Sequence, residues 1–352
     1  MRVHVDLAEE LDVAEWSARH ARGEVPDVVP YGLDKLSAHG IAAEFRRPLH
    51  GRTADFARKV RGRTRQMDFV SSAGWAMRRA RRTADAALCW DERTGVPAAL
   101  VPGGPPVASG AVWLDDKAAL PGPLRVVTGR ALHRMGAVFS CCEPTRAAVE
   151  QEWRLPTGRV HRFTMGVDEQ FYRPLPAPER PGVVVSVGDD RRRDHAQLVR
   201  VMEQVGQSGV DARLELATTQ RHVEVPEHVG VVHRRRMEGT ILDLYGRSSV
   251  VAIALKRCTG VFGITVALEA MACARPVVIT ANAGLEEYIE DGVTGLLVPP
   301  GDDRAFRDAV ASLLTDPEAA AEMGRAGRRA VEERFTTGHT AADLAVILRA
   351  TS

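Results

Sequence analysis

The sequence predicts an α/β protein made of two doubly wound domains, each a parallel β-sheet covered by helices. Three observations support this fold class. Short β-rich runs alternate with helical stretches along the whole chain. Several runs, such as Val183–Val187, are continuously apolar, as expected of strands buried on both faces. A chain of 352 residues is also too long for one ordinary domain and suits two.

The predicted elements alternate in both halves of the chain. In the first half, strands are predicted at Arg2–Val5, Ala42–Arg46, Ala86–Cys89, Val107–Trp113, Ala137–Ser140 and Val160–Phe163. Helices are predicted between them at Phe56–Arg65, Ser72–Thr83, Gly95–Leu100, Leu124–Arg134 and Pro144–Trp153. In the second half, strands are predicted at Val183–Val187, Ala212–Ala217, Val229–His233, Val250–Leu255, Pro276–Ile279 and Gly295–Val298. Its helices are predicted at Ala196–Val205, Gly239–Ser248, Ile264–Cys273, Glu286–Glu290, Asp303–Leu314 and Pro317–Arg334.

A proline-rich connector separates the halves. Tyr172–Gly182 (YRPLPAPERPG) holds four prolines in eleven residues, which makes it stiff and non-helical. We therefore expect a first domain over residues 1–171, a linker over 172–182 and a second domain over 183–335. Residues 336–352, with an amphipathic helix at Thr340–Ala350, are expected to pack back on the first domain. Two such domains imply a cleft between the carboxyl ends of their sheets.

Composition excludes several classes of protein. Lys+Arg 47 against Asp+Glu 46 rules out a uniformly basic nucleic-acid coat protein. No apolar run approaches the roughly 20 residues of a membrane span, and the N-terminus has no signal-peptide stretch. Five cysteines without a C-x-x-C pair favour reduced thiols in a cytoplasm. The eleven histidines show no H-x-x-x-H spacing, so we expect no bound metal. No cofactor is expected either.

A loop suited to an anion follows the first strand of the second domain. Val183–Asp194 (VVVSVGDDRRRD) joins a buried strand to Gly188, then to Arg191, Arg192 and Arg193, and then to a helix start. A glycine turn lets an anion approach a helix N-terminus, and arginine forms paired hydrogen bonds with phosphate oxygens. The alternative is a solvated loop with charged tips.

A second candidate lies in Thr259–Pro276 (TGVFGITVALEAMACARP), where a glycine-punctuated loop enters an apolar helix with one carboxylate, Glu269. A carboxylate on such a helix needs hydrogen-bond donors. The vicinal hydroxyls of a ribose would supply them, as would local backbone N–H groups or an arginine. Gly284, between a strand and a short helix, offers backbone N–H groups to a diphosphate.

Four motifs together resemble the inter-domain segment and the second domain of retaining family-4 glycosyltransferases. They are GVD…F at Gly166–Phe171, FGITVALEAMACARPVV, GLEEYIEDGVTGLLVPPGD and MGRAGRRAVEERF, in the family's order and ending at Phe335. The first half resembles the family only in its strand–helix layout. The resemblance implies the GT-B fold, with two Rossmann-like domains facing across a cleft. It also implies a nucleotide-diphosphate sugar as donor and transfer with retention of anomeric configuration.

The resemblance implies roles for individual residues. Glu269 matches the second Glu of the family's E-x7-E and would hold the donor ribose. Arg193, with Arg191 or Arg192, is the nearest counterpart of the Arg/Lys pair that grips the diphosphate, so Arg193 and Glu269 are the expected catalytic pair. The expected donor site comprises Gly188, Arg191, Arg192, Arg193, Thr259, Gly260, Phe262, Gly263, Ile264, Glu269, Gly284 and Leu285.

The chain departs from the family at the first Glu of E-x7-E. Strict counting places that position at Val261, and alignment on Phe262-Gly263 places it at Gly260. In the family that Glu contacts the hexose of the donor. Its absence here leaves open which sugar the donor carries and whether the chain is active.

The first domain is expected to bind the acceptor. Asp91 and Glu92 follow one predicted strand, and Asp115 and Asp116 follow the next, so their carboxylates could accept hydrogen bonds from an acceptor hydroxyl. They could equally be helix caps. Gly32 lies where the family has a glycine-rich loop and allows close approach of a ligand to the backbone.

Residues 46–82 are strongly basic, with twelve Arg/Lys against Asp55 and Asp68. One interpretation is a surface that binds an anionic acceptor or contacts an anionic membrane. A contact of the second kind would be with the inner face of the membrane. The other is an arginine-rich solvated face. Aromatic residues are sparse in this segment, so nucleic acid is not an expected partner.

The function that these features favour is glycosyl transfer to a small-molecule or envelope-glycan acceptor. Two alternatives stay open: a sugar-nucleotide epimerase or hydrolase of the same fold, and a non-catalytic pseudo-transferase that binds a partner enzyme.

Overall fold

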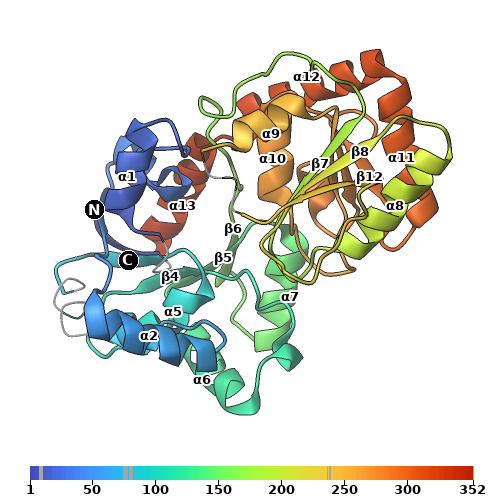
Figure 1. Ribbon diagram of the computed structural model, residues 1–352. Helices are drawn as coiled ribbons and strands as arrows, with labels where there is room; N and C mark the ends of the chain where they lie inside the picture. Colours follow the sequence, from blue (N-terminus) through green and yellow to red (C-terminus); the bar gives the residue numbers. More distant parts are fainter. Residues whose placement is uncertain (8–10, 74–77, 79–81, 236, 238, 352) are drawn as a thin grey trace. The chain divides into compact units, whose positions relative to one another are not determined.

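The computed structural model describes residues 1–7, 11–73, 78, 82–235, 237 and 239–351 (Figure 1). The chain forms two compact units. The first comprises Met1–Arg19, Val28–Thr164 and Gly338–Ser352, and the second comprises His20–Asp27 and Met165–Thr337. These bounds differ from those expected, because residues 165–182 pack with the second unit. In the connector, Leu175 N–H donates to the carbonyl of Cys273, and the Arg275 guanidinium donates to the carbonyls of Leu175 and Pro176.

The first unit contains a parallel sheet whose strands, in spatial order, are β2 (Ala42–Phe45), β1 (Arg2–Asp6), β3 (Ala86–Cys89), β4 (Val107–Gly110), β5 (Ala137–Ser140) and β6 (Val160–Arg162). Its helices are η1 (Pro30–His39), α2 (Gly51–Arg63), α3 (Phe69–Ala73), α5 (Glu92–Ala99), η2 (Lys117–Ala119), α6 (Gly122–Arg134) and α7 (Glu143–Trp153). Helix α1 (Val13–Ala21) begins in this unit, and α13 (Thr337–Thr351) lies almost wholly within it.

The second unit repeats the architecture. The strands of its parallel sheet, in spatial order, are β12 (Leu296–Val298), β11 (Val277–Thr280), β10 (Val250–Ile253), β7 (Val183–Val187), β8 (Arg213–Ala217) and β9 (Gly230–His233). Its helices are α8 (His195–Gln207), α9 (Ile241–Arg247), α10 (Ile264–Ala272), η3 (Leu285–Glu287), α11 (Asp303–Thr315) and α12 (Pro317–Arg334).

Both sheets confirm the predicted doubly wound α/β class, and their strand order fixes where ligands can bind. In a parallel sheet, ligands bind beyond the carboxyl ends of the strands, at the point where the strand order reverses. That point lies between β10 and β7 in the second unit and between β1 and β3 in the first. The loops after β7 and β10 are those that carry Arg193 and Gly263.

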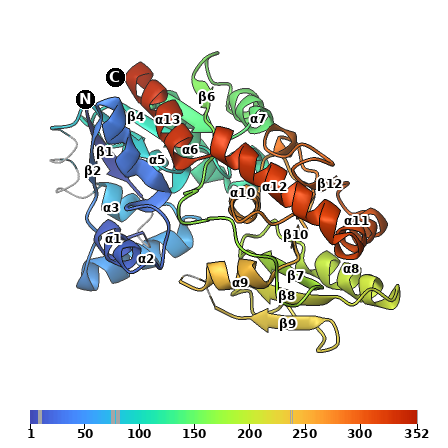
Figure 2. The ribbon, with the colours of Figure 1, turned by 90° about the horizontal axis from the view of Figure 1, so that it is seen from above.

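Apolar side chains join helices to each sheet. In the second unit, α8 and α11 lie side by side and share a core with the sheet through Leu198, Val201, Phe306 and Val310 (Figure 2). Helix α10 packs against α12 and contacts β10 and β11. In the first unit, α5, α6 and α7 share a core with β3, β4 and β5.

Several elements of the structure differ from those predicted. Helix α1 was not predicted, and it buries none of its side chains. The strand predicted to reach Trp113 ends at Gly110, because the N–H groups of Val112 and Trp113 donate to the Glu92 carboxylate instead of a neighbouring strand. The helix predicted at Ser72–Thr83 lies partly outside the described residues.

Candidate functional site

The loop after β7 turns one arginine inward. Arg193 is 6% exposed, and its Nε donates to Oδ2 of Asp190 at 2.8 Å. Its Nη1 is buried and has no hydrogen-bond partner among the described residues. Asp194 caps α8 by accepting from Gln197 N–H at 2.9 Å. A buried donor without a partner is costly, and here it belongs to a cation beside a helix start, which is the arrangement expected of an anion site.

A pocket of about 660 Å³ opens beside this loop. Its lining includes Arg191, Arg193, Lys256 and Gln220. Arg191 and Lys256 are exposed, and with the inward Arg193 they place cations around the pocket, whose lining also includes Asp189, Asp194 and Glu224. Arg192 lies 5.4 Å above the ring of Phe262, which ties it to the neighbouring loop. The structure thus leaves Arg191 and Arg193 on one pocket and turns Arg192 toward Phe262.

The loop after β10 meets the same arginine. Gly263 has a φ of +80° and is the N-cap of α10, with no side-chain cap. A Cβ atom on Gly263 would lie 3.1 Å from Nη1 of Arg193, so the guanidinium lies against the first turn of the helix. The N–H groups of a first helical turn carry the positive end of the helix dipole. Here Ile264 N–H donates to the Val261 carbonyl at 3.1 Å. Ile264, the first residue of α10, is buried.

The Thr259–Gly260 segment is fixed by the loop after β11. Thr259 forms a parallel bridge with Ala283, and Gly260 N–H donates to the Ala283 carbonyl at 3.2 Å. Gly284 has a φ of +98°, and its N–H donates to Oε2 of Glu286 at 2.9 Å. That N–H would have to leave Glu286 to bind a diphosphate. Leu285 is fully buried and serves as a packing residue.

Glu269 lies on α10, about one and a half turns beyond Gly263. Its side chain is partly buried and accepts two hydrogen bonds, from Tyr172 Oη at 3.0 Å and from Tyr245 Oη at 2.7 Å. Burial raises the pKa of the Glu269 carboxyl to about 7, while the two phenols and the positive charge of Arg193 act to lower it. Ribose hydroxyls, local backbone N–H groups or an arginine are the hydrogen-bond donors to Glu269 that the sequence suggests. The two donors in the structure are instead tyrosine hydroxyls. Tyr172 and Tyr245 lie 97 and 24 residues before Glu269 in the sequence, and no sequence pattern marked them as its partners.

In the first unit, three of the predicted acceptor carboxylates are already engaged. Asp91 caps α5 by accepting from Arg93 N–H and also pairs with the Arg93 guanidinium. Asp116 caps η2. Glu92 is 3% exposed and accepts from Val112 N–H and Trp113 N–H, and burial followed by the charge of Asp91 raises its pKa to about 7. Asp115 is partly buried.

Gly32 is held in a left-handed turn. Its φ is +64°, and the preceding Tyr31 has a φ of +63°, which is rare for an aromatic residue. The Tyr31 ring stacks on Trp90 with centroids 3.8 Å apart, and Trp90 directly follows β3. The aromatic pair therefore lies near the point where the strand order of the first sheet reverses.

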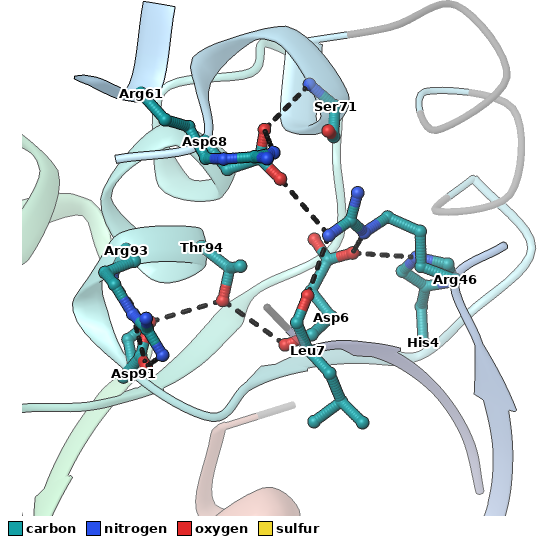
Figure 3. A network of polar contacts seen from close by, with 10 residues as sticks. All are labelled: His4, Asp6, Leu7, Arg46, Arg61, Asp68, Ser71, Asp91, Arg93 and Thr94. Atoms are coloured by element: carbon teal, nitrogen blue, oxygen red, sulfur yellow. Dashed lines mark hydrogen bonds and ion pairs between the residues drawn. The ribbon is translucent and has the colours of Figure 1, made fainter. Parts of the chain in front are cut away.

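A buried network that the sequence did not indicate lies at the same point (Figure 3). Arg46 Nε pairs with Asp6 Oδ1 at 3.0 Å, and Arg46 Nη2 pairs with Asp68 Oδ2 at 3.2 Å. Arg61 Nη1 approaches Asp68 at 3.8 Å. Arg46 and Arg61 were counted as part of a basic surface, but their charges are balanced by Asp6 and Asp68 inside the unit. Nothing in the local sequence pattern marks Asp6 and Asp68 as the partners of Arg46.

Among the described residues, no group of three or more His, Cys, Asp or Glu side chains could hold a metal ion. In the same part of the chain, no helix is both long enough and apolar enough to cross a membrane.

A comparison with protein families matches residues 168–330 to a model described as "Glycosyl transferases group 1". Curated relatives include D-inositol 3-phosphate glycosyltransferase of Kribbella flavida, 40% identical over 110 residues, which are 30% of this chain and 25% of that protein. They also include alpha-maltose-1-phosphate synthase of Mycolicibacterium smegmatis, 33% identical over 233 residues, covering 56% of this chain and 58% of that protein. In each case the matched part is less than two thirds of the relative's length.

Solved structures show the fold. Sucrose-phosphate synthase from Thermosynechococcus elongatus superposes with a TM-score of 0.74 at 18% identity, over 99% of this chain and 98% of that one. HepE of Anabaena, solved with UDP and glucose, gives a TM-score of 0.67 at 15% identity over 99% of both chains. The chain has the GT-B fold.

Proposed function

We propose that the chain is a glycosyltransferase that moves a sugar from a nucleoside diphosphate sugar to an acceptor hydroxyl with retention of anomeric configuration. The observation that carries the proposal is the buried Nη1 of Arg193 beside the first turn of α10, the helix that also bears Glu269. An anion and a hydroxyl pair can be bound along this one helix. The family match over residues 168–330 and the names of the curated relatives support the same reading.

In the proposed reaction, Arg193 and the N–H groups at the start of α10 stabilise the departing diphosphate. The bond between the anomeric carbon and the diphosphate breaks, and the acceptor hydroxyl forms its bond on the face that the diphosphate left. A diphosphate oxygen accepts the proton of that hydroxyl. Glu269 holds the ribose. Because Arg193 supplies positive charge at the leaving group, this reaction needs neither a protein nucleophile nor a bound metal.

We further propose that the first unit takes the acceptor near Gly32 and the Tyr31–Trp90 stack. The carboxylates of Asp91, Glu92 and Asp116 would act on an acceptor only after leaving their present partners. D-Inositol 3-phosphate is the first acceptor to test, since several relatives are named for it.

The exposed face of α2 is a candidate contact with an anionic membrane. Arg52, Phe56, Lys59 and Arg63, here called the α2 stripe, follow one another at helical spacing and are all exposed, Phe56 at 59%. A basic face with one exposed aromatic ring fits an anionic lipid surface. The proposal is narrower than the basic segment predicted from the sequence, because Arg46 and Arg61 pair internally.

The activity is tested by incubating the purified chain with UDP-, GDP- and ADP-sugars, with and without D-inositol 3-phosphate and other hydroxyl acceptors. Formation of a glycosylated acceptor whose anomeric configuration matches the donor is the expected result. Released or isomerised sugar without transfer would support the hydrolase or epimerase alternative instead. Nucleotide binding without any turnover would favour the non-catalytic alternative.

A further inference from the structure

The Glu269 carboxylate is held by two phenols that come from outside its helix. Tyr172 belongs to the connector and donates to Oε1, whereas Tyr245 belongs to α9 and donates to Oε2. Tyr172 is 5% exposed and Tyr245 is fully buried. Their rings meet edge to face with centroids 6.4 Å apart, so packing fixes both hydroxyls before any ligand binds.

This arrangement determines what the carboxylate can still accept. Each oxygen of an ionised carboxylate accepts about two hydrogen bonds, and one of them is taken on each oxygen here. Rotation of the carboxylate would break both phenol contacts. One acceptor position therefore remains on each oxygen, in a fixed direction, on a side chain that is only partly buried. Two neighbouring hydroxyls are a ligand group that would fill both positions.

We propose that Tyr172 and Tyr245 are positioning residues that lock Glu269 for a vicinal diol and so make the site select ribonucleotides over 2′-deoxyribonucleotides. The inference rests on the proposed function, because it assigns the donor ribose to Glu269. A rigid site built for two hydroxyls penalises a ligand that lacks one, since a polar group is then left without a partner. A mobile carboxylate could turn to the remaining hydroxyl and would discriminate less.

The same contacts set the charge of Glu269. The groups that act on its pKa are Tyr245 on α9, Tyr172 in the connector and Arg193 after β7. Cys273, after α10, is a further titratable group beside it. The Cys273 thiol stays protonated, because burial raises its pKa to about 12. The phenols favour the ionised carboxylate, so the loss of either hydroxyl raises the pKa of Glu269 further above its present value of about 7. A role limited to packing would not move this titration.

The test compares the wild type with Tyr172→Phe, Tyr245→Phe and the control Tyr288→Phe. Tyr288 is fully buried in the same unit, and its hydroxyl accepts from Met165 N–H at 2.9 Å, away from Glu269. Titration calorimetry measures the affinities for UDP, GDP and ADP and for dUDP, dGDP and dADP between pH 6 and 9. Circular dichroism checks the fold of each variant.

We expect the wild type to bind its preferred ribonucleotide at least about tenfold more tightly than the 2′-deoxy form. Tyr172→Phe and Tyr245→Phe should lower that ratio to about twofold or threefold and move the pH midpoint of ribonucleotide binding upward. Tyr288→Phe should leave the ratio and the midpoint unchanged.

The outcomes separate the two proposals. If the wild type binds none of these nucleotides, the proposed function fails. If it binds them but both phenylalanine variants keep the wild-type ratio and midpoint, the phenol lock is overturned and the proposed function stands. Should those variants not fold, Glu269→Gln takes their place, since the amide retains a similar shape. In Glu269→Gln, the pH midpoint of ribonucleotide binding near 7 must disappear, and the preference for the ribonucleotide over its 2′-deoxy form must fall. An unchanged preference would overturn the inference.

Discussion

Nη1 of Arg193 lies so close to Gly263 that a Cβ atom on the glycine would come within 3.1 Å of it. Gly263 therefore satisfies two demands at once. It adopts a φ of +80° at the start of α10, and it leaves room for the guanidinium. The cation and the helix start can converge on one anion only because no side chain stands between them.

Gly263→Ala separates these two demands when it is compared with Gly301→Ala. Gly301 has a φ of +79° and nothing within 4 Å of an added Cβ atom, so both variants strain the backbone by about 1–2 kcal/mol. Only Gly263→Ala displaces Arg193. We expect a larger loss in Tm for Gly263→Ala, because its Cβ atom would also lie 2.8 Å from Cγ2 of Ile253. The affinity for a nucleoside diphosphate should fall at least about tenfold in Gly263→Ala alone. Equal nucleotide affinities in the two variants would contradict this.

Arg193→Ala should weaken binding of a nucleoside diphosphate far more than binding of the bare nucleoside. The guanidinium offers hydrogen bonds to a charged acceptor, which are worth about 1.5–3 kcal/mol each, so a loss of about 10–100-fold is expected in calorimetry. Arg191→Ala is the matched control, because Arg191 is exposed on the same loop. A diphosphate-specific loss in Arg191→Ala, with none in Arg193→Ala, would move the anion site to the outer arginine.

Glu92→Gln should change how stability depends on pH. The pKa of Glu92 is raised from 4.5 to about 7 in the folded state, so the folded protein binds more protons than the unfolded chain between these values. The stability that the protonated carboxyl contributes is fully present below pH 4.5 and lost as the pH rises through about 7. The stability of Glu92→Gln relative to the wild type should therefore rise by about 1–3 kcal/mol across this range. Denaturant unfolding from pH 4.5 to 8 measures it, and a constant difference would rule out the raised pKa.

Charge reversal on the α2 stripe tests membrane contact. Lys59→Glu with Arg63→Glu should lower co-sedimentation with vesicles of anionic phosphatidylglycerol by at least about threefold, and Phe56→Ser should also lower it. Arg304→Glu serves as the control, because the Arg304 side chain is 85% exposed in the second unit. Neutral phosphatidylcholine vesicles give the background. Equal co-sedimentation of all variants would leave the α2 stripe as a solvated face.

The sequence predicted most of the second unit because its signals there are local. The β-branched run Val183–Val187 forms β7 with the predicted bounds, and Pro317–Arg334 forms α12 in the same way. Glu269 also could be singled out, as the one carboxylate on an apolar helix.

The partners of these residues could not be predicted, since they depend on tertiary contacts. Tyr172 reaches Glu269 from 97 residues away. Asp68 joins Arg46 inside the first unit, although both lie in a segment whose composition suggests a basic surface. Glu92 changes the course of the chain after β4 by binding N–H groups of residues 112 and 113. In each case the sequence shows the residue type but not what folding brings beside it.

The second unit includes His20–Asp27, a segment that is synthesised long before the rest of it. Asp27 N–H donates to the Asp168 carboxylate at 2.7 Å, and its own carboxylate accepts from Thr337 Oγ1 across 310 residues. The first unit in turn needs residues 338–352. Neither unit can therefore finish folding on the ribosome before the other has been translated almost entirely. Such contacts between distant parts of the chain slow folding. Until they form, the nascent N-terminal half exposes apolar surface, and we expect chaperones to bind it.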